Sequence, residues 1–326
     1  MNNHISVIVV TYNAERYIQK GFIENLVVNS QANCFKISFI ILDNGSCDDT
    51  VELIKTRFPE IDLIISYSNT GYCKGVNIAL QYAYQKYNSK YFIIFDQDAK
   101  SEKNYLQKLV AFMENHPEAG FVQPLIKSLS DHSKLYSAGH EYIGKNNLFC
   151  RPATKTKKKD GFIEILSGSI LGSIVSQVSL KKNGLLDPRF ELYYESSDWC
   201  FRFRKNGFKC YCLYDAVVYH ARNLNKSNLQ QLYFVFRNKI LFWAKHNHTK
   251  FLSCKQEFEK EIKCIEKKQK NKPFVRDSFL QMKMNALKDG LALSKKFKGN
   301  YSEPNLKFYK FDCVVLDYRK KYLSGN

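Results

Sequence analysis

The first hundred residues repeat one pattern: a short, strongly apolar run that stops abruptly at polar residues. The apolar runs occupy residues 5–10, 35–42 and 91–95, and a shorter run covers residues 61–67. Uninterrupted apolar runs of this length are typical of strands buried on both faces of a parallel sheet, and the segments between them have helical spacing. The pattern therefore predicts an α/β, Rossmann-like fold with a mostly parallel central sheet flanked by helices.

The chain length of 326 residues suits one such domain followed by an extension. The alternation of strands and helices gives way near residue 100 to shorter, irregular strands, and from about residue 229 onward apolar and basic residues are interleaved with helical spacing. We therefore expect an α/β domain over residues 1–245, divided near residue 100, and a basic, mainly helical C-terminal extension over residues 246–326.

The net charge of the chain is +19, and the segment from His246 onward holds 19 Lys or Arg residues against 9 Asp or Glu residues. Such an excess favours an anionic partner, which can be a nucleic acid, an acidic membrane surface or a phosphorylated small molecule. Motifs of nucleic-acid-binding proteins are lacking, and the basic residues are not interleaved with aromatic ones on one expected sheet face. A nucleic acid is therefore the least favoured of the three partners.

Ten cysteines are scattered along the chain without a metal-binding spacing, so we expect reduced thiols. The N-terminus does not combine a basic segment with a long apolar one, and no stretch offers about 18 consecutive apolar residues. We therefore expect a cytoplasmic protein that associates at most peripherally with the inner face of the cell membrane.

The polar residues that end the apolar runs should meet at one edge of the sheet, where ligands of open parallel sheets bind. Asp96 and Asp98 follow the fourth run and can reach the same small volume, and their oxygens suit Mg²⁺ or Mn²⁺ bridging to a diphosphate. Gly71 allows close approach of a backbone, and Lys74 offers positive charge to a phosphate. Asp43 is placed to accept hydrogen bonds from a base or a ribose.

A series of segments matches the motifs of a known enzyme family in order: SVIVVTYN, LDNGS, NTGYCKGVN, FDQD and DPRFELYYESSDWCFRFRKNGF through VVYH. Together they span roughly residues 5–240. The chain thereby resembles the inverting family 2 glycosyltransferases, which implies the GT-A fold with a nucleotide-binding half over residues 1–100 and an acceptor-binding half over residues 101–245. The resemblance also implies an enzyme that moves a sugar from a nucleotide diphosphate donor to a hydroxyl group.

The same resemblance implies roles for individual positions. Asp96, Asp98 and His220 would hold the metal ion. Without the resemblance, His220 at a strand end and the pair Arg237-Asn238 on a helix are also compatible with structural roles. The residues implied in binding the nucleotide-sugar are Thr11, Tyr12, Asn13, Asp43, Asn69, Gly71, Lys74, Asn77, Asp96, Gln97 and Arg237.

The chain departs from the family pattern where the catalytic base is expected. The family shows Glu-Asp-x-Asp with the second residue as base, whereas this chain has Glu195-Ser196-Ser197-Asp198. Because serine cannot act as a base at neutral pH, either Glu195 or Asp198 takes the proton, or the chain is a catalytically impaired homologue that binds a sugar nucleotide. We favour rescue by a neighbouring acid, since the long Glu195 side chain can span the displacement, and we expect Arg202 to pair with these acids.

Resemblance also narrows the substrates. The DQD triplet and the Asp-Trp-Cys-x-Arg stretch resemble the bacterial rhamnosyltransferases, which implies a dTDP-L-rhamnose donor, with UDP-linked sugars as the alternative. It implies a saccharide or lipid-linked oligosaccharide acceptor in surface polysaccharide synthesis, such as that of O-antigen or capsule. The basic tail, with Lys267, Lys268 and Phe279, is compatible with docking on an anionic membrane surface or with a solvated helical cap.

Two rival interpretations are weaker. A sugar-phosphate nucleotidyltransferase would need a glycine-rich, basic loop directly after the first strand, and residues 11–16 (TYNAER) do not form one. A basic nucleic-acid-binding protein would explain the net charge but none of the motifs.

Overall fold

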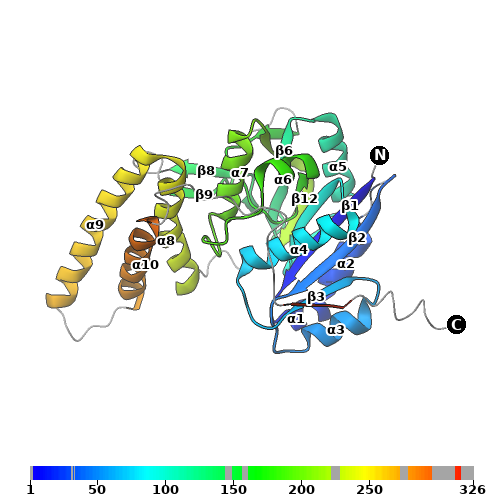
Figure 1. Cartoon of the computed structure of the whole chain (residues 1–326), viewed down its shortest axis with the longest axis horizontal. Coiled ribbons are helices and arrows are strands. Elements are labelled where there is room, and N and C mark those ends of the chain that lie inside the picture. The colour runs from blue at the N-terminus through cyan, green and yellow to red at the C-terminus, as the bar shows by residue number, and fades with distance from the viewer. Residues whose placement is uncertain are drawn as a thin grey trace.

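The computed structural model describes residues 3–30, 32, 34–143, 149–155, 161–221, 228–271, 278–295 and 313–316. A large sheet with helices on both faces makes up most of the molecule, and a group of helices from the C-terminal part of the chain projects from one end of it (Figure 1). This arrangement confirms the predicted α/β fold with a helical C-terminal part.

The N-terminal half alternates strands and helices as the apolar runs predict. In β1, the side chains of Ile5, Val7 and Val9 enter the core layer covered by helices α1, α2 and α3, while Ile8 and Val10 enter the layer covered by α4. Burial on both faces explains why these runs are continuously apolar. The elements are β1 (His4–Thr11), α1 (Glu15–Gln19), α2 (Phe22–Asn29), β2 (Lys36–Asp43), α3 (Thr50–Arg57), β3 (Asp62–Ser66), α4 (Tyr72–Tyr87) and β4 (Tyr91–Asp96).

The second half contains short strands of three or four residues, as predicted, but also two longer strands of 10 and 12 residues, and it differs from the prediction at one further point. The sequence predicts two strands over residues 210–214 and 216–220, but the structure has a single strand, β12, whose register against β6 shifts between Leu213 and Val217. The exposed Asp215 lies at this irregularity, and pairing resumes beyond it. The elements are β5 (Ala99–Ser101), α5 (Tyr105–Asn115), β6 (Ala119–Ser128), β7 (Leu135–Ser137), β8 (His140–Ile143), β9 (Phe149–Pro152), β10 (Phe162–Glu164), β11 (Ser173–Ser176), α6 (Gln177–Asn183), α7 (Glu195–Lys205) and β12 (Lys209–His220).

Eleven of the described strands form one sheet, whose main path runs β10-β12-β6-β11-β4-β1-β2-β3-β13, where β13 spans Cys313–Leu316. Off this path β5 pairs with β12 and β7 pairs with β6, and β8 and β9 form a separate two-stranded sheet. Pairing is parallel from β4 through β1 and β2 to β3, and again between β6 and β12. Strand β11 is antiparallel to both β4 and β6 and so joins the two parallel regions. The sheet is therefore mixed, with its parallel nucleus in the N-terminal half.

The C-terminal helices are α8 (Leu229–His246), α9 (His248–Asn271) and α10 (Ser278–Ser294). Asn247, between α8 and α9, has an extended backbone that ends the first of these helices. The helical spacing of the sequence predicts a helix over residues 229–250, and α8 ends four residues earlier. Helix α10 crosses α8 at Gly290, where a Cβ would lie 2.5 Å from Ile240 Cγ2 and 2.8 Å from the Arg237 carbonyl oxygen. Gly290 thus permits the close packing of these two helices. Within the described ranges, none of the helices combines the length and hydropathy required to span a bilayer.

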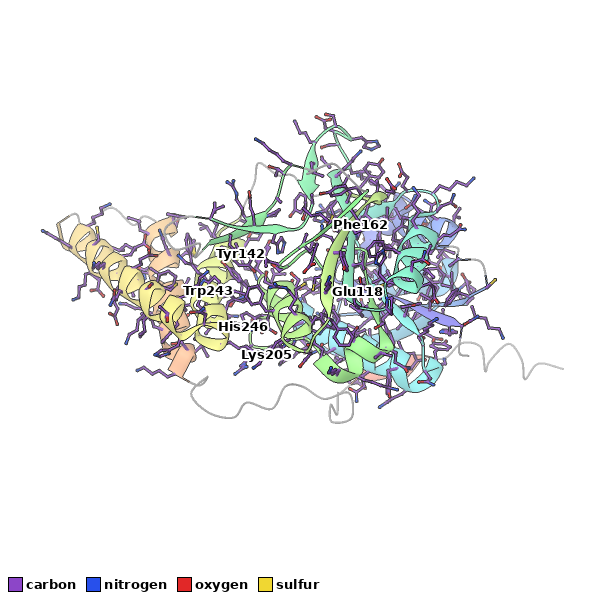
Figure 2. All side chains as sticks on the ribbon, turned by 90° about the horizontal axis from the view of Figure 1, so that it is seen from above. Glu118, Tyr142, Phe162, Lys205, Trp243 and His246 are labelled. Atoms are coloured by element: carbon purple, nitrogen blue, oxygen red, sulfur yellow. The ribbon has the colours of Figure 1, made fainter. Side chains whose placement is uncertain are left out.

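Helix α8 also packs on the α/β part through aromatic side chains. Tyr142 of β8 lies against Trp243 of α8 with ring centroids 5.8 Å apart, and Phe201 of α7 contacts both Phe242 and His246. Figure 2 shows Tyr142, Trp243 and His246 close together where α8 meets the rest of the molecule. Helix α8 therefore packs on both the α/β part and the other C-terminal helices.

Candidate active site

A cavity of ≈1490 Å³ opens at the carboxyl ends of β1 and β4. Its wall continues with the start of α4, the end of β12, the loop before α7 and the first turns of α8. Sites for one drug-sized ligand measure about 300–1,000 Å³. The cavity therefore has room for more than one ligand, and it lies where the sequence placed the binding site.

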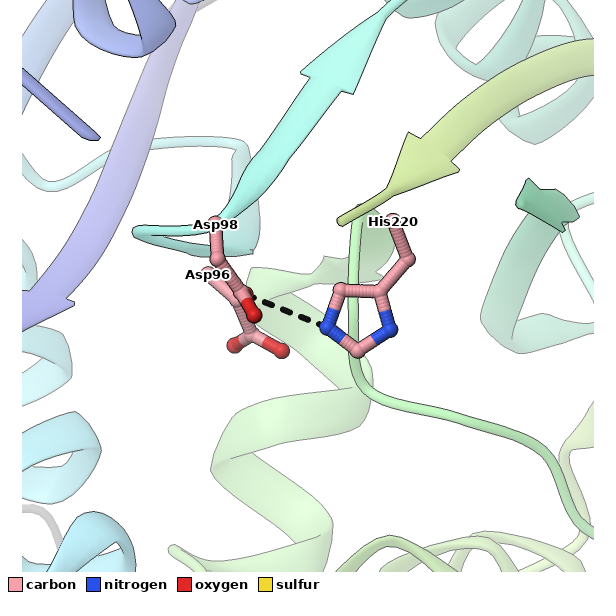
Figure 3. Close-up of side chains that lie close together, drawn as sticks. All are labelled: Asp96, Asp98 and His220. Atoms are coloured by element: carbon pink, nitrogen blue, oxygen red, sulfur yellow. Dashed lines mark hydrogen bonds and ion pairs between the residues drawn. The ribbon is translucent and has the colours of Figure 1, made fainter. Parts of the chain in front are cut away.

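Three metal-ligating side chains converge in this cavity (Figure 3). Asp96 ends β4, Asp98 lies in the turn before β5, and His220 ends β12 opposite Ala99 of β5. One ligand atom of each lies within 4.8 Å of the others. His220 Nε2 is 3.1 Å from Asp98 Oδ1, so the antiparallel β5–β12 pair is what brings the distant histidine to the two carboxylates.

The electrostatics of this cluster suit a divalent cation. Burial, and then the neighbouring Asp98, raise the pKa of Asp96 to about 6, against the opposing effects of His220 and the Tyr72 hydroxyl. His220 Nδ1 is buried and makes no hydrogen bond to any residue that the structure describes. Two carboxylates and an imidazole are a donor set that Mn²⁺ and Mg²⁺ accept, and a cation would relieve the repulsion between the acids. The residues present therefore fit the metal that the sequence predicts.

The polar residues after β1 and before α4 form the opposite wall. Tyr12 and Gln97 hold each other, because the Tyr12 backbone N–H donates to Gln97 Oε1 (2.7 Å) and Gln97 Nε2 donates to the Tyr12 carbonyl (3.1 Å). Gly71 has a φ of 87°, a backbone conformation that favours glycine. The predicted donor-binding residues that line the cavity are Thr11, Tyr12, Asn69, Gly71, Lys74, Asp96 and Gln97.

Two predicted nucleotide-binding residues lie behind this wall. Asp43 is fully buried and accepts hydrogen bonds from Thr11 Oγ1 (3.1 Å) and the Ser46 backbone (2.9 Å). Asn13 Oδ1 accepts from the Cys47 backbone (3.0 Å). Both side chains hydrogen-bond within the loops and neither residue is part of the cavity lining, so their direct contact with a nucleotide stays a prediction.

Asn77 and Arg237 also face away from the cavity. Asn77 is fully buried, donates to the Leu186 carbonyl (2.8 Å) and accepts from the Leu186 N–H (2.9 Å). Arg237 is buried against the loop before α7, where it donates to the Arg189 carbonyl (2.8 Å) and pairs with Glu191 (2.7 Å). Their polar atoms are hydrogen-bonded to that loop and neither residue is part of the cavity lining, so their contact with the donor stays a prediction.

Glu195, the first residue of α7, points a carboxyl group into the cavity. It is 7% exposed, and its Oε2 is buried without a hydrogen-bond partner in the described part of the chain. Burial raises the pKa of Glu195 to about 7, helped by Asp96 and opposed by backbone hydrogen bonds. A carboxyl group with a pKa near neutrality in a cavity is suited to proton transfer.

Asp198 lies in a different environment. It is fully buried and takes part in ion pairs with Arg202 Nε (2.9 Å), Lys245 Nζ (2.8 Å) and His246 Nε2 (2.8 Å). Although burial alone would raise the pKa of Asp198, the cations of Arg202 and Lys245 and the hydrogen bond from His246 hold it well below its usual range. Asp198 is not part of the cavity lining, so Glu195 is the better placed of the two predicted bases. The expected pairing of Arg202 with an acid is confirmed.

Sequence reasoning missed several residues of the site. The Tyr72 hydroxyl donates to Asp96 Oδ1 (2.7 Å), and Tyr136 presents its ring to His220 edge-on at 5.2 Å. Tyr72 lies inside the NTGYCKGVN segment, so its position could have been flagged. Tyr136 and the cavity-lining residues of α8, among them Gln230 and Phe234, belong to no motif.

Comparisons with known proteins agree with this geometry. The sequence model of glycosyl transferase family 2 matches residues 6–172, just over half of the chain. The chain belongs to glycosyl transferase family 2. It is 26% identical over 223 residues to the dTDP-rhamnosyl transferase RfbF of Shigella flexneri, covering 68% of this chain and 70% of that protein. It is 24% identical over 245 residues to an N-acetylglucosaminyl-diphospho-decaprenol L-rhamnosyltransferase of Mycobacterium tuberculosis, covering 68% and 77%.

Solved structures of glycosyltransferases share the fold of this family member. The complex of S. aureus TarS residues 1–349 with UDP-GlcNAc matches with a TM-score of 0.55 at 19% identity, covering 88% of this chain and 80% of that one. The Pyrobaculum calidifontis mannosyltransferase PcManGT, solved with GDP-Man and Mn²⁺, matches with a TM-score of 0.51 at 16% identity, covering 91% and 76%. These likenesses confirm the GT-A fold, and the family and its relatives confirm that the protein is a glycosyltransferase.

Proposed function

We propose that this glycosyltransferase is metal-dependent and inverting, and that it transfers L-rhamnose from dTDP-L-rhamnose to a hydroxyl group of a lipid-linked oligosaccharide in bacterial surface polysaccharide synthesis. The observation that carries metal-dependent transfer is the meeting of Asp96, Asp98 and His220 with the carboxyl group of Glu195 in one cavity. The donor is supported by the two rhamnosyltransferase relatives, and the acceptor by the relative named for a diphospho-decaprenol compound.

In this proposal Asp96, Asp98 and His220 hold Mg²⁺ or Mn²⁺, which when bound offsets the charge of the departing nucleotide diphosphate. Lys74 lines the same cavity and brings an ammonium group to the diphosphate side. Gly71 lets the backbone before α4 approach the donor, because glycine has no side chain and readily adopts the positive φ found here. These residues bind and orient the donor.

Glu195 supplies the base. Its carboxylate takes the proton of the acceptor hydroxyl while the acceptor oxygen bonds to the anomeric carbon, on the face opposite the breaking bond to the diphosphate oxygen. The hydroxyl groups of Ser196 and Ser197 line the same wall and are free of the charge that a second carboxylate would bring. In this proposal the acid that acts as the base, Glu195, lies one residue earlier than in the resembling enzymes, where Ser196 of this chain would be the acid. The alternative, an impaired sugar-nucleotide-binding homologue, predicts binding without turnover.

We further propose that the C-terminal helices dock on the anionic cytoplasmic leaflet, where a lipid-linked acceptor would lie. Lys267 and Lys268 are exposed near the end of α9, and Phe279 of α10 is 38% exposed. The cluster Arg319-Lys320-Lys321 and residues Phe297 and Phe308, which the sequence also suggests for membrane contact, lie outside the described residues. Flotation with liposomes containing or lacking phosphatidylglycerol tests this: binding only to the anionic vesicles supports it, and equal behaviour in both contradicts it.

The function is tested by incubating the full chain with dTDP-L-rhamnose or UDP-linked sugars, with Mn²⁺, Mg²⁺ or EDTA, and measuring released nucleotide and transferred sugar. We expect turnover of dTDP-L-rhamnose that requires the metal and that Glu195→Gln lowers by about 100- to 1,000-fold. Turnover that persists undiminished in EDTA would contradict the metal-dependent mechanism. Metal-dependent nucleotide binding without any turnover would support the impaired homologue instead.

A further inference from the structure

The segment from Asp187 to Glu195, here called the catalytic loop, brings Glu195 into the cavity through a backbone that its own residues disfavour. Glu191, Tyr193 and Tyr194 have φ values of 57°, 65° and 66°. Residues with a Cβ rarely adopt this left-handed conformation, and three such residues within four positions are unusual. A strained segment persists only where its surroundings enforce it, so contacts from outside the loop must hold it.

Those contacts come from Asn238 in the middle of α8. Its Nδ2 lies within hydrogen-bond distance of the carbonyls of Phe190 (2.6 Å), Leu192 (2.8 Å) and Tyr193 (2.8 Å), so its two N–H groups are shared among three acceptors. The side chain is fully buried. One amide group therefore holds three carbonyl groups within four residues of the loop backbone.

Arg237 completes this hold and fixes the orientation of the Asn238 amide. Arg237 Nε donates to Asn238 Oδ1 (2.8 Å), which leaves Nδ2 facing the loop carbonyls. The guanidinium also donates to the carbonyls of Arg189 (2.8 Å) and Phe190 (3.0 Å) and pairs with Glu191 (2.7 Å). Arg237 and Asn238 are buried, so their hydrogen bonds to the loop carbonyls are shielded from water, whereas the Glu191 side chain that pairs with Arg237 is 48% exposed.

The loop also contacts the donor-binding side of the cavity. The Cys73 N–H at the start of α4 donates to the Glu191 carbonyl (3.2 Å), one of the residues bonded by Arg237. Residues Glu191 through Ser197 all line the cavity. The position of the loop thus sets the separation between the donor-binding residues around Gly71 and the carboxyl group of Glu195.

We propose that Arg237 and Asn238 are positioning residues that hold the catalytic loop, so that the middle of α8 places Glu195 without itself lining the cavity. The inference rests on the proposed role of Glu195. It makes the C-terminal helices a part of the catalytic machinery, distinct from any membrane contact they make. Misplacement of a catalytic group by about 1 Å can cost about 100-fold in rate. Loss of the hydrogen bonds from Arg237 and Asn238 should therefore lower turnover more than it lowers binding.

The test compares full-length variants. Asn238→Ala removes the amide, and Asn238→Asp keeps its size but removes the donor hydrogens. Arg237→Lys keeps the charge but loses the forked geometry. The matched control is Lys239→Met, since Lys239 is the next residue of the same helix, is equally buried, and pairs with Glu257 of α9 at 3.5 Å instead of with the loop.

Three quantities are measured: hydrogen exchange of residues 187–195 without ligands, binding of Mn²⁺ alone, and kcat and KM with dTDP-L-rhamnose. For Asn238→Ala and Asn238→Asp we expect exchange at least about tenfold faster in the loop, Mn²⁺ affinity within about threefold of wild type, and kcat about 100-fold lower. Arg237→Lys should fall between wild type and Asn238→Ala. Lys239→Met should lower the melting temperature without changing loop exchange or kcat.

Two results would overturn the inference: Asn238→Asp behaving as wild type in exchange and turnover, or Lys239→Met losing as much turnover as Asn238→Ala. If wild type turns over no sugar nucleotide, the proposed function fails, and the exchange data alone then decide whether Asn238 holds the loop.

Discussion

The two chemical ends of the cavity are built in different ways. At the metal-binding end, Asp96 and Asp98 lie where a buried strand stops, and pairing of β5 with β12 brings in His220. At the base-carrying end, Glu195 follows a loop in left-handed conformation that is bonded to a helix more than forty residues later in the sequence. The first end is set by the register of the sheet, whereas the second depends on contacts between distant parts of the chain. The metal end should therefore be robust to change elsewhere, and the base end should not.

The largest effect is expected at the metal-binding end. Asp98→Ala removes one of three ligands and should lower turnover by about 1,000-fold or more, because a metal contributes several kcal/mol to the stabilisation of a departing diphosphate. Calorimetric titration with Mn²⁺ should show binding lost as well. Asp131→Asn, which alters an exposed turn, is the control and should change neither quantity. Normal Mn²⁺ binding by Asp98→Ala would place the metal elsewhere.

The base-carrying end should respond in a different quantity. Glu195→Gln keeps the shape of the side chain but cannot take a proton, so turnover should fall by about 100- to 1,000-fold while Mn²⁺ and dTDP bind as in wild type. Released nucleotide and calorimetric affinities are the readouts. Retention of nearly full rate would show that another group is the base.

Asp198 is expected to contribute to the stability of the fold and not to the transfer reaction. Replacement by Asn leaves the buried cations of Arg202 and Lys245 without their carboxylate, and breaking a buried ion pair from one side costs about 3 kcal/mol or more. Urea unfolding at pH 7 should show this loss. Because the folded pKa of Asp198 is depressed, its contribution is present above the ordinary pKa near 3.8 and lost as pH falls below it. The difference between variant and wild type should therefore shrink below pH 4, and a constant difference would contradict the ion-pair account.

A smaller effect concerns the cost of burying Glu195. Its folded pKa of about 7 lies above the ordinary 4.5, so the folded state binds the proton more tightly and stability is lost as pH rises through this window. Glu195→Gln should thus be more stable than wild type at pH 8, by about 3 kcal/mol, and equal to it near pH 4. Thermal unfolding across this range measures the difference. Equal stability at pH 8 would mean that the carboxyl group is not desolvated.

The same comparison explains what the sequence could predict. β1, β2 and β4, together with Asp96 and Asp98, were predictable because burial on both faces of the sheet leaves a local apolar pattern that ends at the site. His220 was reached only through resemblance, since no local feature shows that β12 pairs with β5. Strand β12 itself is predicted from the sequence as two strands, because the polar Asp215 at the register shift looks like the end of a strand.

The base-carrying end could not be predicted from local patterns. Glu195 and Asp198 are three residues apart, and only the folded chain shows that Lys245 and His246 neutralise the second and leave the first in the cavity. The predicted role of Arg237 at the donor rests on resemblance alone, because a buried arginine and a ligand-binding arginine look alike in sequence. Three residues with left-handed backbone leave no compositional signal when none of them is glycine.

The central claim is that Asp96, Asp98 and His220 hold a cation beside the nucleotide. A crystal structure of the full chain with dTDP and Mn²⁺, recorded at the manganese absorption edge, tests it most directly. The account predicts an anomalous peak about 2.1 Å from oxygens or nitrogens of these side chains and in contact with the diphosphate. A structure with dTDP in the cavity and no manganese among the three side chains would contradict it.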